Sequence, residues 1–218
     1  PSALSCVIPP CTSPGPSANL REVDVAYLGV APSGNGQLVS VTGSGAQHQL
    51  TSWSLAAGDG QPTAQVTTAA IDGHHARVNA LTGALVAAGQ PRFVTGRIVA
   101  DGNVFLSSRQ LNAAGAFTDH GTIGYGDNAN VEVLSYDLAV RLIYSGFFVS
   151  HYQIVTPVVV EPTAGGPMAL RLVSWQVNAT TGAITGLEDS GNLPLAFPQS
   201  LTPDEIADWS RRGRRVGC

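Results

Sequence analysis

The chain contains no lysine, because all eleven of its basic residues are arginines. This excludes mechanisms that need a Schiff-base lysine or the lysine of a phosphate-binding loop. Charged residues make up only 12% of the 218 residues, and the net charge is −4. This negative balance argues against nucleic acid as the main partner. No apolar run approaches the length that spans a membrane.

Cysteine is scarce, and the three cysteines lie near the chain ends, at Cys6, Cys11 and Cys218. The Cys6–Cys11 spacing lacks the further ligands that a zinc site needs. In an oxidising compartment Cys218 could pair with Cys6 or Cys11. Alternatively, Cys6 pairs with Cys11 and Cys218 is free for an intermolecular bond. No basic segment precedes an apolar one at the start, so we expect a secreted or surface protein whose signal peptide has already been removed.

Helix signals are also nearly absent. The exception is residues 202–209, where Thr202, Pro203 and early acidic residues predict one short helix. The arginines after it are interpreted as a solvated tail. Residues 1–20 are rich in proline and serine and predict an extended arm. We therefore expect an arm at 1–20, a single repetitive β domain at 21–198, and a helix with an arginine-rich tail at 199–218.

The chain is instead rich in a repeated pattern of strands. Residues 37–61 contain two apolar, β-branched segments around a glycine loop, and the pattern returns at 93–111 and 153–177. Such repetition indicates one supersecondary unit copied along the chain. We predict three units of four strands, at about 21–75, 76–130 and 131–192. The strands predicted in the first unit are about 23–30, 38–42, 49–55 and 62–70, and the third unit is predicted to begin with a strand at 131–140.

The predicted fold class is therefore all-β, with three four-stranded antiparallel repeats. Val78 follows the equivalent Val23 by 55 residues, a period typical of a β-propeller blade. Propellers close with about four to eight blades, so three are too few for a ring. Either two or more chains share one ring, or the sheets pack differently. The alternatives are a threefold arrangement like a β-trefoil or β-prism, and a sandwich.

Equivalent positions of the three units carry Trp53, Arg109 and Trp175. Each tryptophan has apolar neighbours on its own face, which favours packing between sheets. The alternative is an exposed indole that stacks against a sugar. Arg109 must meet a carboxylate or reach water, since a buried unpaired charge is costly. We favour a paired structural arginine over one that binds ligand, and keep both readings.

The loops that leave the units are the second set of candidates. Asp72, Asp127 and Asp189 each lie where a unit ends, and their spacings of 55 and 62 residues indicate equivalent positions. Loops commonly carry binding residues, and clustered polar groups could bind sugar hydroxyls. The alternative is that these residues only make turns by bonding their own backbone. The other candidates in the same loops are His74, Asn128 and Asn192.

A resemblance adds to this reading. The segments Leu50–Trp53, Leu172–Trp175 and Asp189–Gly191, each near a glycine turn, resemble repeats of secreted bacterial β-propellers. Some of those proteins are multi-blade lectins. The resemblance implies that sugar pockets lie between neighbouring blades. The second unit departs from the pattern, because Arg109 stands where tryptophan is expected.

Three functions follow from these patterns. The first is a secreted carbohydrate-binding protein, homo-oligomeric or part of a larger assembly, that binds glycans at blade junctions or exit loops. The second is a structural protein without a small ligand. The third is a propeller-type glycoside hydrolase or lyase with carboxylates near the axis. We predict no catalytic residue, cofactor or metal site: no G-x-S-x-G elbow is present, and adjacent His74 and His75 would point to opposite faces of a strand.

Overall fold

The structure of this chain, a computed structural model, describes residues 22–31, 33–44, 46–81, 91–112, 115–126, 132–145, 148–161 and 167–194. These residues form β-strands and turns, and none of them is helical. Several predictions fall outside them. They concern the N-terminal arm, the helix at 202–209 with its tail, Asp127, Asn128, Cys6, Cys11 and Cys218.

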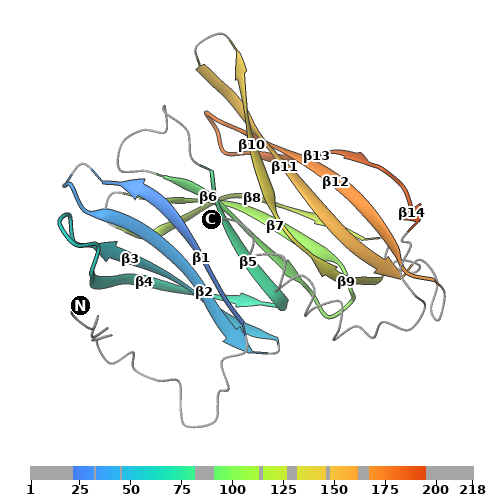
Figure 1. Cartoon of the computed structure of the whole chain (residues 1–218), viewed down its shortest axis with the longest axis horizontal. Helices are drawn as coiled ribbons and strands as arrows, with labels where there is room; N and C mark the ends of the chain where they lie inside the picture. Colours follow the sequence, from blue (N-terminus) through green and yellow to red (C-terminus); the bar gives the residue numbers. More distant parts are fainter. Residues whose placement is uncertain are drawn as a thin grey trace, which may run out of the picture.

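The strands form three antiparallel sheets that follow one another along the chain (Figure 1). Sheet A contains, in order, β1 (Glu22–Val30), β2 (Gly36–Ser44), β3 (Gln47–Leu55) and β4 (Pro62–Asp72). Sheet B contains β5 (His74–Leu81), β6 (Arg92–Ile98), β7 (Val104–Leu111) and β8 (Phe117–Tyr125). An all-β chain with three antiparallel sheets of about four strands each is thus confirmed.

Sheet C contains β10 (Ala139–Ser145), β11 (Phe148–Glu161), β12 (Ala169–Asn178) and β13 (Ile184–Asp189) in order. Two short strands adjoin this path: β9 (Glu132–Tyr136) pairs with β11, and β14 (Leu193–Pro194) pairs with β12. The prediction of one strand at 131–140 was wrong, because β9 and β10 are separate. They are divided opposite Pro157, which has no N–H to donate to a ladder. At this point the Asp137 N–H donates to the Pro157 carbonyl at 3.2 Å.

The third and fourth strands of every sheet are joined in the same way. The turn between them carries a glycine with positive φ: Gly60 at 69°, Gly115 at 81° and Gly182 at 78°. Glycine adopts this conformation without the steric cost that a Cβ adds. Each third strand also has a register shift directly after a serine, at Ser52, Ser108 and Ser174. In all three sheets the fourth strand holds the extra residue of a β-bulge, so the three units are structural repeats.

Each sheet has two faces, named here after the repeated residues. The front face carries Trp53, Arg109 or Trp175. The back face carries Leu50, Leu106 or Leu172, three residues earlier on the same strand. Since side chains alternate along a strand, residues three apart lie on opposite faces. Paired residues on neighbouring strands share a face, so the strand register shows whether each of the other residues lies on the front or the back face.

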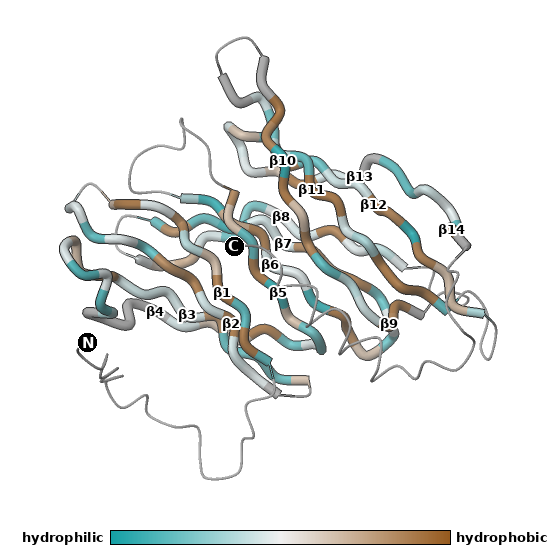
Figure 2. The backbone as a smooth tube through the Cα atoms, in the orientation of Figure 1, coloured by the Kyte–Doolittle hydropathy of each residue, from teal (hydrophilic) through white to brown (hydrophobic). Residues whose placement is uncertain are grey.

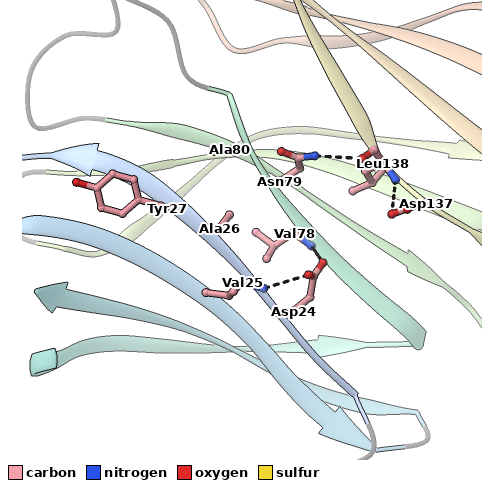
Figure 3. A pocket seen from close by; sticks show the side chains of 9 residues that line it. All are labelled: Asp24, Val25, Ala26, Tyr27, Val78, Asn79, Ala80, Asp137 and Leu138. Carbon is pink, nitrogen blue, oxygen red and sulfur yellow. Dashed lines mark hydrogen bonds between the residues drawn. The ribbon is translucent and has the colours of Figure 1, made fainter. Parts of the chain in front are cut away.

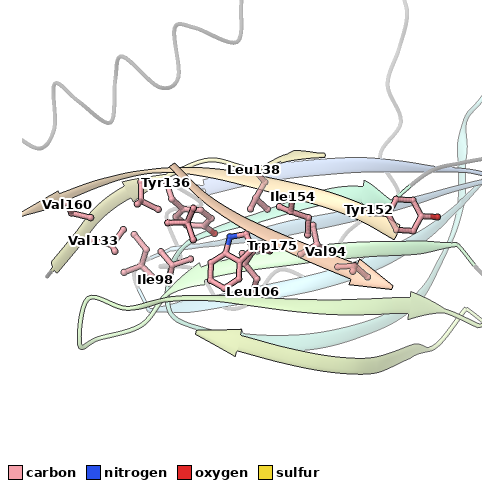
Figure 4. Close-up of a cluster of buried hydrophobic side chains, with 14 of the residues drawn as sticks. Val94, Ile98, Leu106, Val133, Tyr136, Leu138, Tyr152, Ile154, Val160 and Trp175 are labelled. Atoms are coloured by element: carbon pink, nitrogen blue, oxygen red, sulfur yellow. The ribbon is translucent and has the colours of Figure 1, made fainter. Parts of the chain in front are cut away.

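The sheets pack in chain order, with the back face of one sheet against the front face of the next. One core joins the back of sheet A to the front of sheet B, and includes Val39, Leu50, Val78, Phe93 and Leu111. A second joins the back of sheet B to the front of sheet C (Figure 4). Its members include Val94, Leu106, Tyr152, Ile154 and Trp175. Sheet B is therefore the middle layer of three.

Polar contacts support the second of these interfaces. Arg92 of β6 donates to the carbonyl oxygens of Asn178 at 3.1 Å and Thr180 at 2.6 Å, and also to that of Ala179. Nearby, Asn79 Nδ2 donates to the carbonyl oxygen of Leu138 at 3.1 Å. The turn that joins β12 to β13 is thus held by a buried guanidinium from sheet B, which fixes sheet C on sheet B.

Candidate functional site

The three repeated positions named from the sequence lie in the third strand of each sheet, next to the bulge. Trp175 is buried, with 2% of its surface exposed, and donates Nε1 to Thr156 Oγ1 at 3.0 Å. Trp53 is half-buried and donates Nε1 to Ser40 Oγ at 2.8 Å. Both indoles therefore make the same hydrogen bond to a hydroxyl on the second strand.

Arg109 replaces this bond with an ion pair. Its Nε lies 2.8 Å from Asp119 Oδ1 on the neighbouring strand, although the Nε–H is not aligned for a hydrogen bond. Burial lowers the pKa of Arg109, while Asp119 acts to raise it. The carboxylate expected from the sequence is therefore present. Thr95, which stands where Ser40 and Thr156 stand, has no hydrogen-bond partner for its hydroxyl among the described residues.

The exit-loop candidates do not occupy one position. Asp72 ends β4 and pairs with Gln47, six residues before Trp53. Asp189 ends β13 and pairs with Val173, only two residues before Trp175. The equivalence of these two aspartates, inferred from their spacing, does not hold in the strand register. Asp72 is exposed, and His74, which begins β5, is half-buried.

The structure brings Asp189 and Asn192 together with two residues that the sequence reading missed. Tyr125 of β8 donates its hydroxyl to Asp189 Oδ2 at 2.6 Å. Arg171 of β12 donates from Nη1 to the Tyr125 hydroxyl at 2.9 Å and from Nε to Asn192 Oδ1 at 2.7 Å. Arg171 Nη1 also lies 3.4 Å from Asp189 Oδ2. We call Tyr125, Arg171, Asp189 and Asn192 the junction cluster, because it bridges sheets B and C.

The junction cluster borders the core and opens to solvent. The Tyr125 and Trp175 rings form a T-shaped pair, with a centroid distance of 6.2 Å and an interplanar angle of 85°. Asp189 and Asn192 are exposed, while Tyr125 and Arg171 are half-buried. Burial raises the pKa of Tyr125, and its bond to Asp189 raises it further, so the hydroxyl remains a donor. The cluster thus offers fixed donors and acceptors beside an aromatic ring.

The other junction differs. The strand register places Ile71, Phe105 and Thr122 between sheets A and B, where the junction cluster has Tyr125, Arg171 and Asp189. Two of these three side chains carry no polar group. The polar arrangement therefore occurs at one of the two junctions between described sheets. A signal for Arg171 was available, since it lies four residues before Trp175 and so on the same face. Tyr125 required the packing of the sheets.

A groove runs along the first strands of the sheets (Figure 3). Its volume is about 430 Å³, and its polar lining includes Asp24, Asn79 and Asp137. Asp24 Oδ2 accepts the Val78 N–H at 3.0 Å, so β1 is tied to β5. Asp137 Oδ1 accepts the Leu138 N–H at 2.9 Å. Both carboxylates bind backbone amides, which is the bonding of residues that hold strands in place.

A half-buried carboxylate lies at the start of β1. Glu22 Oε2 lies 2.8 Å from His48 Nε2, and Oε1 lies 3.2 Å from His75 Nδ1. Partial burial acts to raise the pKa of Glu22, but the hydrogen bonds to His48 and His75 outweigh it. The pKa of Glu22 is therefore held well below its ordinary value of 4.5.

This predicts an acid-dependent loss of stability. A carboxyl group with a depressed folded-state pKa stabilises the fold above its unfolded pKa, and this contribution is lost as pH falls towards the folded value. We expect wild type to be more stable than Glu22→Gln at pH 7, with a difference that shrinks as pH falls below 4.5. Thermal unfolding of both proteins across this range measures it. A difference that is constant with pH would contradict the assignment.

Within the described ranges, no group of three or more histidine, cysteine, aspartate or glutamate side chains is placed to hold a metal ion. The described residues also contain no helix long and apolar enough to cross a membrane.

Comparison with known proteins gives no match to a family model, a curated protein or a solved structure.

Proposed function

We propose that this chain is a secreted carbohydrate-binding protein whose sheets are arranged as propeller-like blades and whose sugar site is the junction cluster. The observation that carries the proposal is the meeting of Asp189 and Asn192 with Arg171 and Tyr125 at the border of two sheets.

The chemistry of the cluster suits a sugar. Carboxylate and amide oxygens accept hydrogen bonds from hydroxyl groups, and a guanidinium donates several in a fixed geometry. An aromatic ring at the same place supplies an apolar surface for the C–H groups of a sugar ring. Bonds within the cluster hold these groups in position before a ligand arrives, which lowers the entropic cost of binding.

The order of the sheets supports the blade arrangement. The main path of each antiparallel sheet follows the chain order, and sheets A and B each pack their back face on the front face of the next sheet. The first strands β1 and β5 lie side by side along the groove, where a propeller has its central channel. A structural or assembly role without a ligand is the competing function, and the following test separates the two.

Replacing Asp189 with alanine is expected to weaken glycan retention by about tenfold or more, since a hydrogen bond to a charged group contributes about 1.5–3 kcal/mol. The measurement is binding of the purified chain to an array of immobilised bacterial, fungal and plant glycans. Asp72→Ala is the matched control, because Asp72 also ends a fourth strand and is exposed but lies outside the cluster. It should bind as wild type does.

Two results would count against the proposal. If wild type binds no glycan on the array, the structural role is favoured. If Asp189→Ala and Asp72→Ala bind equally well, the site lies elsewhere on the chain. Thermal unfolding of both variants shows whether a loss of binding reflects a loss of fold.

A further inference from the structure

The two outer faces of the stack differ sharply from their equivalents inside it. Leu50 and Leu106 are both 0% exposed, because the backs of sheets A and B are covered by the fronts of sheets B and C. Leu172, at the same position of sheet C, is 41% exposed. The back of sheet C therefore exposes the leucine position that is buried in both sheet A and sheet B.

The front of sheet A shows the converse. Val25 pairs with Ser40, as Val78 pairs with Thr95 in sheet B. Val78 is 5% exposed beneath sheet A, but Val25 is 54% exposed. Val23 and Tyr27, its neighbours on the same face of β1, are exposed as well. In Figure 2 hydrophobic stretches follow both β1 and β11, which belong to these two outer sheets.

We propose that the back of sheet C in one copy of this chain packs against the front of sheet A in a second copy. The contact repeats the two interfaces already present within the chain, in which a back face bearing the repeated leucine covers the front face of the next sheet. The inference rests on the proposed blade arrangement and does not depend on sugar binding.

The apolar character of both faces supports this contact. On the back of sheet C, the register places Leu170 of the same strand and Val155 and Val159 of β11 around Leu172, and these three side chains are half-buried. On the front of sheet A, Val23, Val25 and Tyr27 form an apolar row. Exposed apolar patches of this kind mark surfaces that bind other proteins.

The number of copies follows from the number of sheets. The contact joins two different surfaces, so repeated addition gives either a closed ring or an open filament. Propellers typically close with about four to eight blades, and six is the multiple of three in that range. Two copies, related by a twofold axis and joined by two identical contacts, therefore complete a ring of six sheets.

The test is the native mass of the whole chain under reducing conditions, measured by light scattering through a dilution series. Wild type is expected at twice the chain mass of 22.4 kDa. Val25→Arg and Leu172→Arg each place a charge in the proposed contact and should weaken self-association by about tenfold or more. Gln61→Arg, in an exposed turn between β3 and β4, is the control and should remain a dimer.

A mixture of the two variants tests the head-to-tail pairing. In a dimer of either variant alone, both contacts of the ring contain the substituted face. In the mixture, the intact sheet C of Val25→Arg can meet the intact sheet A of Leu172→Arg. Mixing should therefore restore a dimer, held by one contact. Circular dichroism checks the fold, and Tyr27→Arg or Ser174→Arg replaces a variant that fails to fold.

Several outcomes would overturn the proposal. A monomeric wild type shows that no second copy covers these faces. A dimer that survives Leu172→Arg shows that the back of sheet C is not in the contact. Oligomers larger than two copies that both variants disrupt show that the contact does not close into a ring of two copies.

Discussion

Replacing Leu106 with aspartate is expected to abolish the folded state. Leu106 is fully buried between sheets B and C. A carboxylate at this point replaces an apolar side chain in the core and loses its hydration, so it must either be buried as a charge or be protonated. The expected cost exceeds about 5 kcal/mol, which is comparable to the whole stability of many domains. Circular dichroism and thermal unfolding measure the effect.

The matched control is the same substitution at Leu172, the equivalent leucine of sheet C. This side chain is 41% exposed, so its carboxylate can remain hydrated. We expect Leu172→Asp to keep the fold of the single chain. If Leu106→Asp unfolds at the wild-type temperature, the packing of sheet B on sheet C is wrong.

Replacing Trp175 with alanine is expected to lower the free energy of unfolding by about 3–5 kcal/mol. The indole fills the core between sheets B and C, touches the Tyr125 ring, and donates to Thr156. Its removal leaves a cavity and a buried hydroxyl without its donor, and both cost free energy. Urea unfolding followed by circular dichroism measures the change.

Trp53→Ala is the corresponding control, because Trp53 has the same repeat position and donates to Ser40 in the same way. Its indole is only half-buried, on the face that no other described sheet covers. The loss should be less than half of that at Trp175. Equal losses would show that position in the repeat, and not burial between sheets, determines the contribution of the indole.

Much of the fold could be predicted from the sequence because its signals are local. Alternating apolar residues and glycine turns located the strands of the first unit to within a few residues: those predicted at about 49–55 and 62–70 are β3 (Gln47–Leu55) and β4 (Pro62–Asp72). The Leu-x-Ser-Trp segments correctly aligned the third strands of the repeats. The division of β9 from β10 was missed, because it depends on Pro157, about twenty residues further along the chain.

The candidate site was less accessible to sequence reasoning. Asp189 and Asn192 were found as turn residues, but their partners come from another strand and another sheet. Tyr125 lies 64 residues before Asp189, and only the packing of sheet B on sheet C brings them together. The spacing between units also gave Asp189 the wrong equivalent, because β4 has eleven residues and β13 only six, so the two fourth strands end at different registers.

The bulge beside Ser52, Ser108 and Ser174 has a consequence for how the three copies can diverge. At each bulge the fourth strand holds one residue that faces no partner, and strand pairing resumes after it; in sheet A a second shift follows between Ser54 and Leu55. Loss of that residue leaves every other side chain on its original face. Loss of one residue elsewhere in the strand moves all following side chains to the opposite face of the sheet. Single-residue changes in repeat length can therefore accumulate at these three points without exchanging core for surface.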